Sequence, residues 1–126
     1  MKVAGSLRVP GDKSISHRAL IFSALSGGNG TGRSESRVTG VLQSADVEST
    51  AGVLRSLGAD VPALSQDFTM RGTGRRMHQP QRELDCGNSG TTTRLMAGVV
   101  AASPIHATFV GDASLSRRPM RRIARP

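Results

Sequence analysis

The spacing of apolar residues along this chain follows two periods, and it predicts a mixture of strands and helices. In "KVAGSLRV", residues 2–9, apolar positions alternate loosely with polar ones, as in a strand, and Pro10-Gly11 ends that run. From Ser14 to Ser26 the spacing becomes helical, and Ser14 is the expected N-cap. The face of this helix that we expect to be buried consists of Ile15, Ala19, Phe22 and Leu25.

The clearest helix covers "SADVESTAGVLRSLGA", residues 44–59. Ser44 is placed to cap it, and Asp46 and Glu48 lie in the first turn, where the helix dipole favours acidic side chains. Gly58 is placed to end the helix. Its predicted buried stripe consists of Val47, Ala51 and Leu54.

Shorter elements repeat this order along the chain. A Gly-rich loop is predicted over residues 27–36. The other apolar runs predict strands over 37–42, 59–64, 68–71, 83–86 and 105–112, with a helix over 89–103. The order of elements restarts near residue 83, which suggests a domain assembled from copies of one unit. Strands that alternate with helices predict an α/β architecture.

Charge narrows the kinds of partner. Of 126 residues, 17 are Lys or Arg and 9 are Asp or Glu, which gives a net charge of +8 and favours anionic partners. Nucleic acid is disfavoured because the chain has three Phe and neither Trp nor Tyr for stacking on bases. A membrane is disfavoured because the longest apolar run, "LMAGVVAA", is far shorter than a bilayer span. We therefore expect small anionic partners, with no nucleic acid and no membrane.

Several reactive residue types have simpler explanations than catalysis. The single cysteine, Cys86, can form no internal disulfide and is better explained as a small buried group. The three histidines lack metal-site spacing, and His17 is better explained by packing or surface exposure than as a base. Asp46 is better explained as a first-turn acid than as a catalyst. Because the N-terminus lacks the apolar core of a signal peptide, we expect a cytoplasmic protein.

The segment "PGDKSISHR" joins a turn to a polar helix start. It lacks the Gly-x-x-x-x-Gly-Lys-Ser pattern of a nucleotide-binding loop. Lys13 and Ser14 nevertheless lie where free backbone N–H groups and the helix dipole favour an anion, and Arg18 lies one turn further on the same face. The pattern alone fits either an anion site or an ordinary capped helix with exposed basic residues.

Two later segments carry a similar signal. In "CGNSGTTTR", two glycines allow a ligand to approach the backbone, and three successive β-branched Thr suit a helix interior poorly, so a binding role is favoured over a plain turn. Arg94 lies near the same end. In "SRRPMRR", four Arg occur within six residues, and we expect most to be solvated and one to be functional.

In this order, "PGDKSISHRAL", "LDCGNSGTTTRLMAG" and "GDASLSRRPM" resemble signatures of the 5-enolpyruvylshikimate-3-phosphate synthase family, over nearly the whole chain. The resemblance implies part of an inside-out α/β barrel domain built from repeated βαβαββ units. Residues 1–13 would be a first strand and crossover, normally packed in the other domain. Residues 14–126 would be an incomplete N-terminal domain, with unit one over 14–80 and a truncated unit two over 81–126.

The resemblance also implies a reaction and a set of binding residues. Phosphoenolpyruvate would donate its enolpyruvyl group to the 5-hydroxyl of shikimate 3-phosphate and release phosphate, a step toward chorismate and the aromatic amino acids, with no metal or organic cofactor. Lys13 would contact both substrates, and Ser14 and Arg18 would hold shikimate 3-phosphate. The phosphoenolpyruvate site would be lined by Asn88, Gly90 and Arg118, where a side chain at position 90 would crowd it.

Two alternatives remain at this point. The related UDP-N-acetylglucosamine enolpyruvyl transferases share the fold and the transfer but carry a Lys-Asn pair in place of "DKSISHR". A basic module that binds phosphate or nucleic acid without catalysis would explain the charge but not "CGNSGTTTR". Since the family's acid–base carboxylates lie in a C-terminal portion that this sequence does not include, we expect the chain alone to be inactive. We expect the full-length form to be a monomer.

Overall fold

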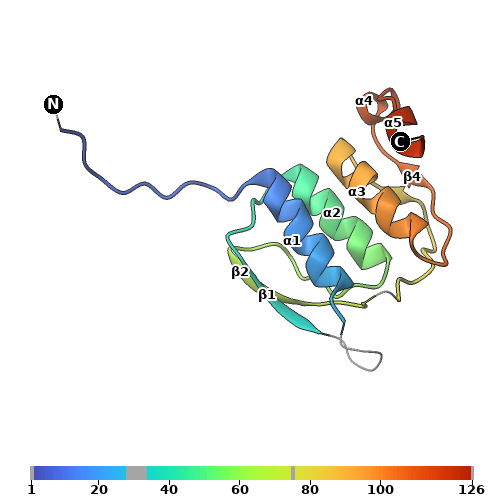
Figure 1. The fold of residues 1–126 in the computed structure, drawn as a ribbon, viewed down its shortest axis with the longest axis horizontal. Coiled ribbons are helices and arrows are strands. Elements are labelled where there is room, and N and C mark those ends of the chain that lie inside the picture. The colour runs from blue at the N-terminus through green and yellow to red at the C-terminus, as the bar shows by residue number, and fades with distance from the viewer. Residues whose placement is uncertain (1, 28–33, 75, 126) are drawn as a thin grey trace.

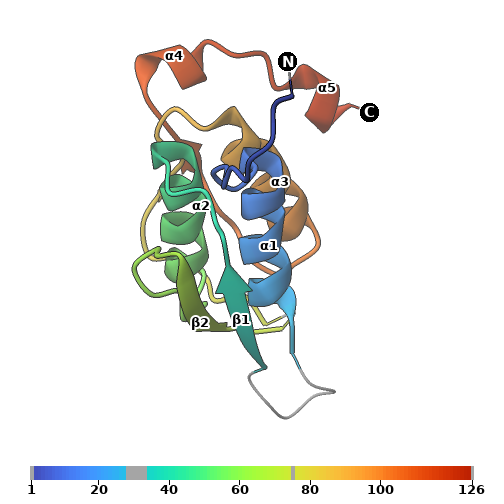
Figure 2. The same cartoon turned by 90° about the vertical axis from the view of Figure 1, so that its left-hand side faces the viewer.

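Three parallel helices form one layer of the molecule. The computed structural model describes residues 2–27, 34–74 and 76–125. Helices α1 (Lys13–Leu25), α2 (Ala45–Ser56) and α3 (Gly90–Ala101) lie side by side and run in the same direction (Figures 1 and 2). Their N-termini therefore gather at one end of the layer, where the three helix dipoles add.

The strands form two small sheets against these helices. β1 (Glu35–Thr39) pairs antiparallel with β2 (Asp67–Arg71), and β3 (Leu84–Asp85) pairs parallel with β4 (Phe109–Val110). Helix α3 makes the crossover between β3 and β4 that a parallel pair requires. The mixed α/β class is therefore confirmed. The described residues form two two-stranded sheets, which are too small to show a barrel or repeated units. Both the barrel and the repeats therefore stay predictions.

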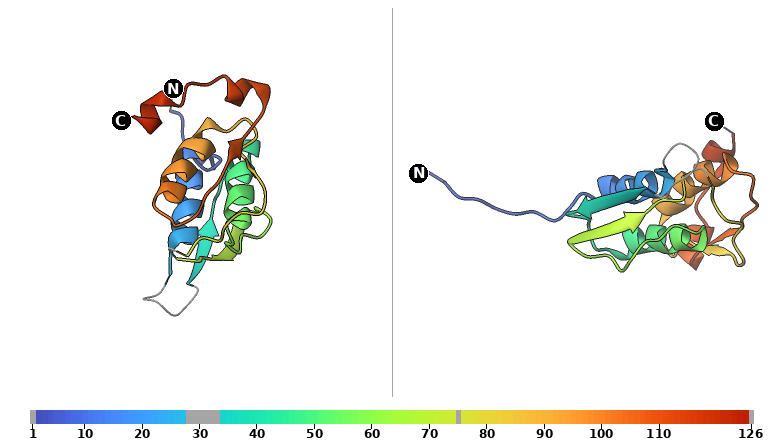
Figure 3. Two further views of the ribbon diagram at one scale, coloured as in Figure 1. Left: turned by 90° about the vertical axis from the view of Figure 1, so that its right-hand side faces the viewer. Right: turned by 90° about the horizontal axis from the view of Figure 1, so that it is seen from below.

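The C-terminal segment carries two short helices, α4 (Ala113–Ser116) and α5 (Arg121–Ala124). Figures 2 and 3 show this segment crossing above the end of the layer where the helix N-termini gather. Residues that are distant in sequence therefore meet at this end. Within the described ranges, no helix combines the length and the apolar character needed to cross a bilayer.

Helix α2 matches its prediction closely. The Ser44 hydroxyl caps it by accepting a hydrogen bond from the backbone N–H of Val47. Gly58 follows the last turn with a φ of 94°, in the left-handed region that favours glycine. All three residues of the predicted stripe are buried, namely Val47, Ala51 and Leu54. The signals that define this helix are local, which explains the agreement.

Helix α1 begins earlier and faces the core differently from its prediction. The N-cap is Asp12, not Ser14, and its carboxylate accepts from the backbone N–H of Ile15. Ile15 and Phe22 are 69% and 67% exposed, so the predicted face is wrong. The face that is buried consists of Ser16, His17, Leu20, Ile21 and Ala24. Two polar residues on the buried face hid it from an argument based on apolar spacing.

The N-terminal segment projects from the body (Figure 1), and the strand predicted over residues 2–9 is absent. Val3 and Leu7 are 87% and 86% exposed, because no described strand lies beside them. Gly11 is the point where the segment meets the body. A Cβ added there would lie 2.0 Å from the carbonyl oxygen of Gly40, so only glycine fits this backbone contact.

Four other predicted strands differ in the structure. The strand expected over 37–42 is β1, which ends before Gly40 at a φ of 70°. The strand expected over 59–64 is reduced to one bridge between Asp60 and Arg71. The strands expected over 83–86 and 105–112 shorten to β3 and β4. Within the loop predicted over 27–36, residues 28–33 lie outside the described residues.

Candidate functional site

The end of the layer where the helices start is built from side-chain caps. Asp12, Ser44 and Ser89 each place an oxygen on a backbone N–H of the first turn of α1, α2 and α3. For α3, the backbone N–H of Thr92 donates to Ser89 Oγ at 3.1 Å. These caps satisfy part of each helix start, and the remaining N–H groups and the dipoles favour negative charge nearby.

Lys13 lies over the start of α2. Its Nζ is 2.7 Å from Asp46 Oδ2, and the two side chains are 50% and 29% exposed. Asp46 is thus a first-turn acid, as expected, and it also fixes the direction of the Lys13 ammonium. An exposed pair of this kind adds little stability. Its main effect is to hold a cation in place beside the helix starts.

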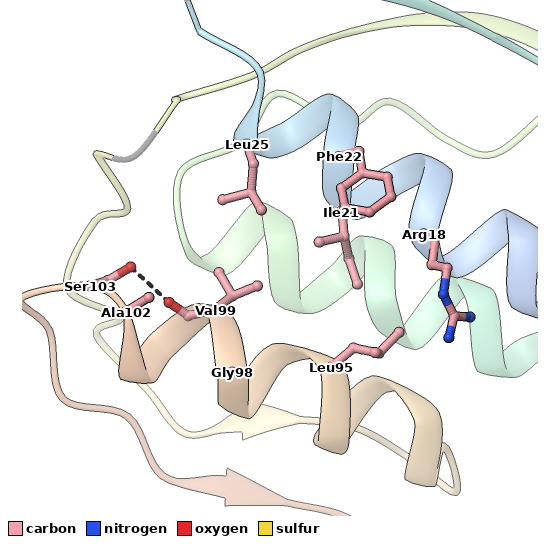
Figure 4. Close-up of a pocket in the computed structure, with 9 residues that line it drawn as sticks. All are labelled: Arg18, Ile21, Phe22, Leu25, Leu95, Gly98, Val99, Ala102 and Ser103. Atoms are coloured by element: carbon pink, nitrogen blue, oxygen red, sulfur yellow. Dashed lines mark hydrogen bonds between the residues drawn. The ribbon is translucent and has the colours of Figure 1, made fainter.

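Ser14 and Arg18 lie on the exposed side of α1. Arg18 Nη1 donates to the carbonyl oxygen of Ser14 at 3.0 Å. Figure 4 shows the Arg18 guanidinium pointing from α1 toward α3, at one end of a groove between these helices. The two residues therefore lie near each other, and the Arg18 charge faces the space between α1 and α3.

A second cluster forms where α4 approaches α3. Arg118 Nη2 donates to Asn88 Oδ1 at 2.6 Å, although 30 residues separate them. The Asn88 amide N–H₂ donates in turn to Asp112, the N-cap of α4. The hydrogen bond from Asn88, together with one from the backbone N–H of Leu115, holds the pKa of Asp112 below its usual value. Asp112 therefore stays ionised and orients the Asn88 amide.

Gly90 leaves a space between two guanidinium groups. A Cβ added there would lie 3.0 Å from Arg118 Nη1 and 3.2 Å from Arg94 Nη1. Two cations this close to one small residue repel each other unless an anion joins them. Arg forks also match the oxygens of phosphate and carboxylate. The arrangement at Gly90 therefore suits an anion.

Arg94 is the residue that sequence reasoning placed nearby without assigning it a role. It lies four residues after Gly90 on α3, so both are on one face. Its Nε is buried and has no hydrogen-bond partner among the described residues. The i, i+4 spacing from Gly90 was the signal that could have identified it.

The other Arg residues of the C-terminal run lie apart from this cluster. Arg117 and Arg121 are exposed, and the side chain of Arg122 lies outside the described residues. Of the run, Arg118 is the residue seen to contact Asn88 and to lie beside Gly90. Arg118 is therefore the candidate for the one functional Arg of the run, and its function stays a prediction.

The two clusters meet through α2. Thr92 Oγ1 lies 3.3 Å from the backbone carbonyl oxygen of Asp46, and the Asp46 carboxylate holds Lys13. Thr92 lies two residues beyond Gly90 in α3. Contacts through Asp46 and Thr92 therefore connect Lys13 with the start of α3, where Gly90 lies.

Cys86 and His17 are structural neighbours of the site. Cys86 is fully buried, which confirms its expected role, and burial raises the pKa of its thiol. His17 is also fully buried, and its Nδ1 lies 2.7 Å from Thr50 Oγ1. In the described part of the chain, no three His, Cys, Asp or Glu side chains are grouped to hold a metal ion.

The fold is thus of the α/β class, with the N-termini of three helices and several basic side chains gathered at one end, an arrangement that favours small anions. The sequence profile of EPSP synthase (3-phosphoshikimate 1-carboxyvinyltransferase) matches residues 1–126. The chain belongs to the EPSP synthase family.

Individual relatives agree with the profile. The 3-phosphoshikimate 1-carboxyvinyltransferase of Zymomonas mobilis subsp. mobilis is 53% identical over 126 residues, which cover 98% of this chain and 26% of that protein. The protein of the same name from a Bradyrhizobium species is 54% identical over 127 residues, covering 98% and 27%. The solved EPSP synthase from Acinetobacter baumannii is 38% identical, with a TM-score of 0.85, covering 95% and 26%. The chain thus spans about a quarter of the length of these relatives.

Proposed function

We propose that the protein containing this chain transfers the enolpyruvyl group of phosphoenolpyruvate to the 5-hydroxyl of shikimate 3-phosphate and releases phosphate. The observation that carries this is the meeting of Arg118, Asn88 and Gly90, from segments about 30 residues apart, in a chain of the EPSP synthase family. The comparisons favour this family over the UDP-N-acetylglucosamine enolpyruvyl transferases and over a non-catalytic basic module.

Phosphoenolpyruvate would bind at Gly90. The guanidinium groups of Arg94 and Arg118 both lie beside Gly90. The negative phosphate and carboxylate of phosphoenolpyruvate would neutralise these two positive charges. Asn88 would present its amide to the same ligand, because Asp112 and Arg118 fix its orientation from both sides. The absence of a side chain at Gly90 leaves room for this ligand.

Shikimate 3-phosphate would bind along the start of α1. Ser14 offers an exposed hydroxyl, and Arg18 offers a guanidinium that faces the space between α1 and α3. Lys13 lies between the two clusters and would contact both substrates, exchanging part of its pairing with Asp46 for contacts with the ligands. These residues bind and orient the substrates, and the proposed reaction needs no cofactor from them.

A domain organisation follows from the exposed N-terminal segment. We propose that residues 1–13 pack in a second domain, since Val3, Leu7 and Val9 are 87%, 86% and 70% exposed beside the described body. Residues 14–126 would form one unit over 14–80 and the start of another over 81–126. The acid and base groups of the reaction would come from outside these residues, so this chain alone would turn over little substrate. We infer that the full protein is a cytoplasmic monomer.

The test is phosphate release by the full protein that contains this sequence, supplied with both substrates. Lys13→Ala is expected to lower kcat/KM for each substrate by roughly 100-fold, because a charged contact to both is lost. Arg82→Ala removes an equal charge from an exposed position to which no role is assigned, and it serves as the matched control. An unchanged kcat/KM in Lys13→Ala would remove Lys13 from the site, and no phosphate release by the parent protein would refute the proposed function.

A further inference from the structure

A chain of buried hydroxyl groups crosses all three helices close to the candidate site. His17 Nδ1 lies 2.7 Å from Thr50 Oγ1, and Thr50 Oγ1 lies 2.7 Å from Thr92 Oγ1. Thr92 Oγ1 then donates to Ser89 Oγ at 2.7 Å. All four residues are fully buried. The chain runs from α1 through α2 to the N-cap of α3, and the proposed roles of Lys13, Asn88 and Gly90 make no use of it.

The donor direction along this chain follows from one atom. His17 Nε2 is buried and has no partner among the described residues. A proton on Nε2 would be an unsatisfied buried donor, so the neutral ring carries its proton on Nδ1 and donates to Thr50. The Thr50 hydroxyl then donates to Thr92, and the Thr92 hydroxyl donates onward to Ser89 Oγ or to the Asp46 carbonyl. Each hydroxyl therefore both accepts and donates.

The far end of the chain adjoins the site residues directly. Ser89 lies between Asn88 and Gly90 in sequence and caps α3. The Asp46 carbonyl that Thr92 reaches belongs to the residue whose carboxylate holds Lys13. Apolar contacts bury surface without strong directional preference, whereas hydrogen bonds fix distance and angle. The chain is therefore suited to fixing how far the α1 cluster stands from the α3 cluster.

We propose that His17, Thr50 and Thr92 are positioning residues, which hold the Lys13–Arg18 side of the site in register with the Asn88–Gly90 side and so set substrate affinity. This proposal rests on the proposed function, and it concerns residues that touch no substrate. The chain works only while His17 is neutral, because the imidazolium would carry a second buried N–H with no acceptor.

The charges around His17 support a neutral ring. Burial lowers the pKa of His17, Asp46 acts to raise it, and Lys13 and Arg18 act to lower it. From α3, the one charged residue is Arg94, whose guanidinium lies at Gly90. The charged side chains of β1 and β2 pair with each other across the two strands, as Glu35–Arg71 and Arg37–Asp67.

Two adjacent threonines give a matched test. Thr92→Val breaks the chain between the helices, whereas Thr93→Val removes a buried hydroxyl that donates within α3 to the Ser89 carbonyl. In the full protein, Thr92→Val is expected to raise KM for both substrates roughly tenfold, since small misplacements of binding groups cost this much or more. Thr93→Val is expected to leave both KM values within about twofold, and Thr92→Ser restores the parent KM because it keeps the hydroxyl. Melting temperatures, measured for each variant, separate lost stability from lost affinity.

A second variant tests the protonation state. His17→Asn places an amide N–H near the position of Nδ1 but cannot titrate, so its KM near pH 7.5 stays close to that of the parent. The parent KM rises more steeply than the Asn variant's KM as pH falls below the ordinary His pKa of about 6.5. His17→Leu raises KM at every pH because it cannot donate.

The outcomes separate the two proposals. Equal KM values in Thr92→Val and Thr93→Val, or an acid-side rise in His17→Asn identical to that of the parent, overturn the positioning role while leaving the reaction intact. If the parent releases no phosphate, the proposed function fails. The same variants are then titrated with inorganic phosphate, where weaker binding by Thr92→Val than by Thr93→Val supports positioning and equal binding overturns it.

Discussion

Helices α1 and α3 are connected by hydrogen bonds at their N-terminal end and separated by an open groove farther along. At the N-terminal end, hydrogen bonds through α2 join them, from His17 by way of Thr50 to Thr92. Farther along, an open groove of about 760 Å³ lies between them (Figure 4). Its apolar lining consists of Ile21, Phe22, Leu25, Leu95, Gly98, Val99 and Ala102.

This difference shows which end of the helix layer requires exact geometry. Burying a series of hydrogen-bonded polar side chains costs desolvation free energy, but the hydrogen bonds hold these side chains at fixed distances from one another. That cost occurs where α1, α2 and α3 begin, beside the cationic clusters. Among the residues that the structure describes, no hydrogen bond crosses the groove, so changes there should affect packing and leave the binding groups in place.

The largest effect is expected from two neighbouring positions on α1. Leu20 is fully buried and Phe22 is 67% exposed in the groove wall. Leu20→Ala is expected to lower the free energy of unfolding by about 2–5 kcal/mol through a lost side chain and a cavity. Phe22→Ala should change it by less than about 1 kcal/mol. Urea unfolding of the 126-residue chain measures both, and similar losses in the two variants would contradict the burial described above.

The next largest effect should separate two adjacent arginines. Arg118 donates to Asn88 and lies beside Gly90, whereas Arg117 is exposed. In the full protein, Arg118→Ala is expected to lower kcat/KM for phosphoenolpyruvate roughly 100-fold, while Arg117→Ala stays within about twofold. Steady-state kinetics decide this prediction. A comparable loss in both variants would mean that the run acts through its total charge.

Two glycines of α3 lie at its first residue and in its last turn, Gly90 and Gly98. Gly90→Ala places a Cβ 3.0 Å from Arg118 Nη1, and KM for phosphoenolpyruvate is expected to rise about tenfold. The fold should tolerate it, because the neighbours are the ends of flexible side chains. Gly98→Ala meets open space and should raise the free energy of unfolding by about 0.5–1 kcal/mol with KM unchanged. Kinetics and urea unfolding of both variants provide the comparison, and an unchanged KM in Gly90→Ala would contradict it.

The smallest effect is the dependence of stability on pH. Since the pKa of His17 is lowered in the folded chain, the unfolded chain binds the proton first as pH falls. The contribution of neutral His17 to the free energy of unfolding is complete above about pH 6.5. It is lost as pH falls toward the lower pKa that His17 has in the folded chain, with a slope of at most about 1.4 kcal/mol per pH unit. Urea unfolding from pH 7.5 to 5 should show this slope in the parent and a reduced slope in His17→Asn. The exposed His106, changed to Asn, is the control that should keep the parent slope.

The sequence predicted the parts of the fold that local signals determine. Ser44 begins α2 by capping it, and Gly58 ends it by adopting a left-handed backbone conformation. Both signals depend only on residues that are close in sequence. The buried face of α1 was wrong because Ser16 and His17 belong to it. Their partners, the Leu42 backbone N–H and the Thr50 hydroxyl, lie 26 and 33 residues away. No local period contains that information.

The candidate site divides in the same way. Lys13 and Gly90 could be singled out because each lies at a helix start within a polar segment. Local sequence signals do not bring Arg118 to Asn88, because this contact depends on how α4 approaches α3, and only the family resemblance placed both residues at one site. The partnership of Lys13 with Asp46 was also missed, because the sequence places them on different helices.

Substitutions at Gly11 should impair binding even though glycine has no side chain to contact a ligand. Its contact with the Gly40 backbone leaves no room for a side chain, yet the position lies only two residues before Lys13. A substitution there would push the chain outward at the entrance to α1 and displace the lysine. In a library scored for both abundance and growth, position 11 should therefore resemble a binding residue, although it carries no functional group.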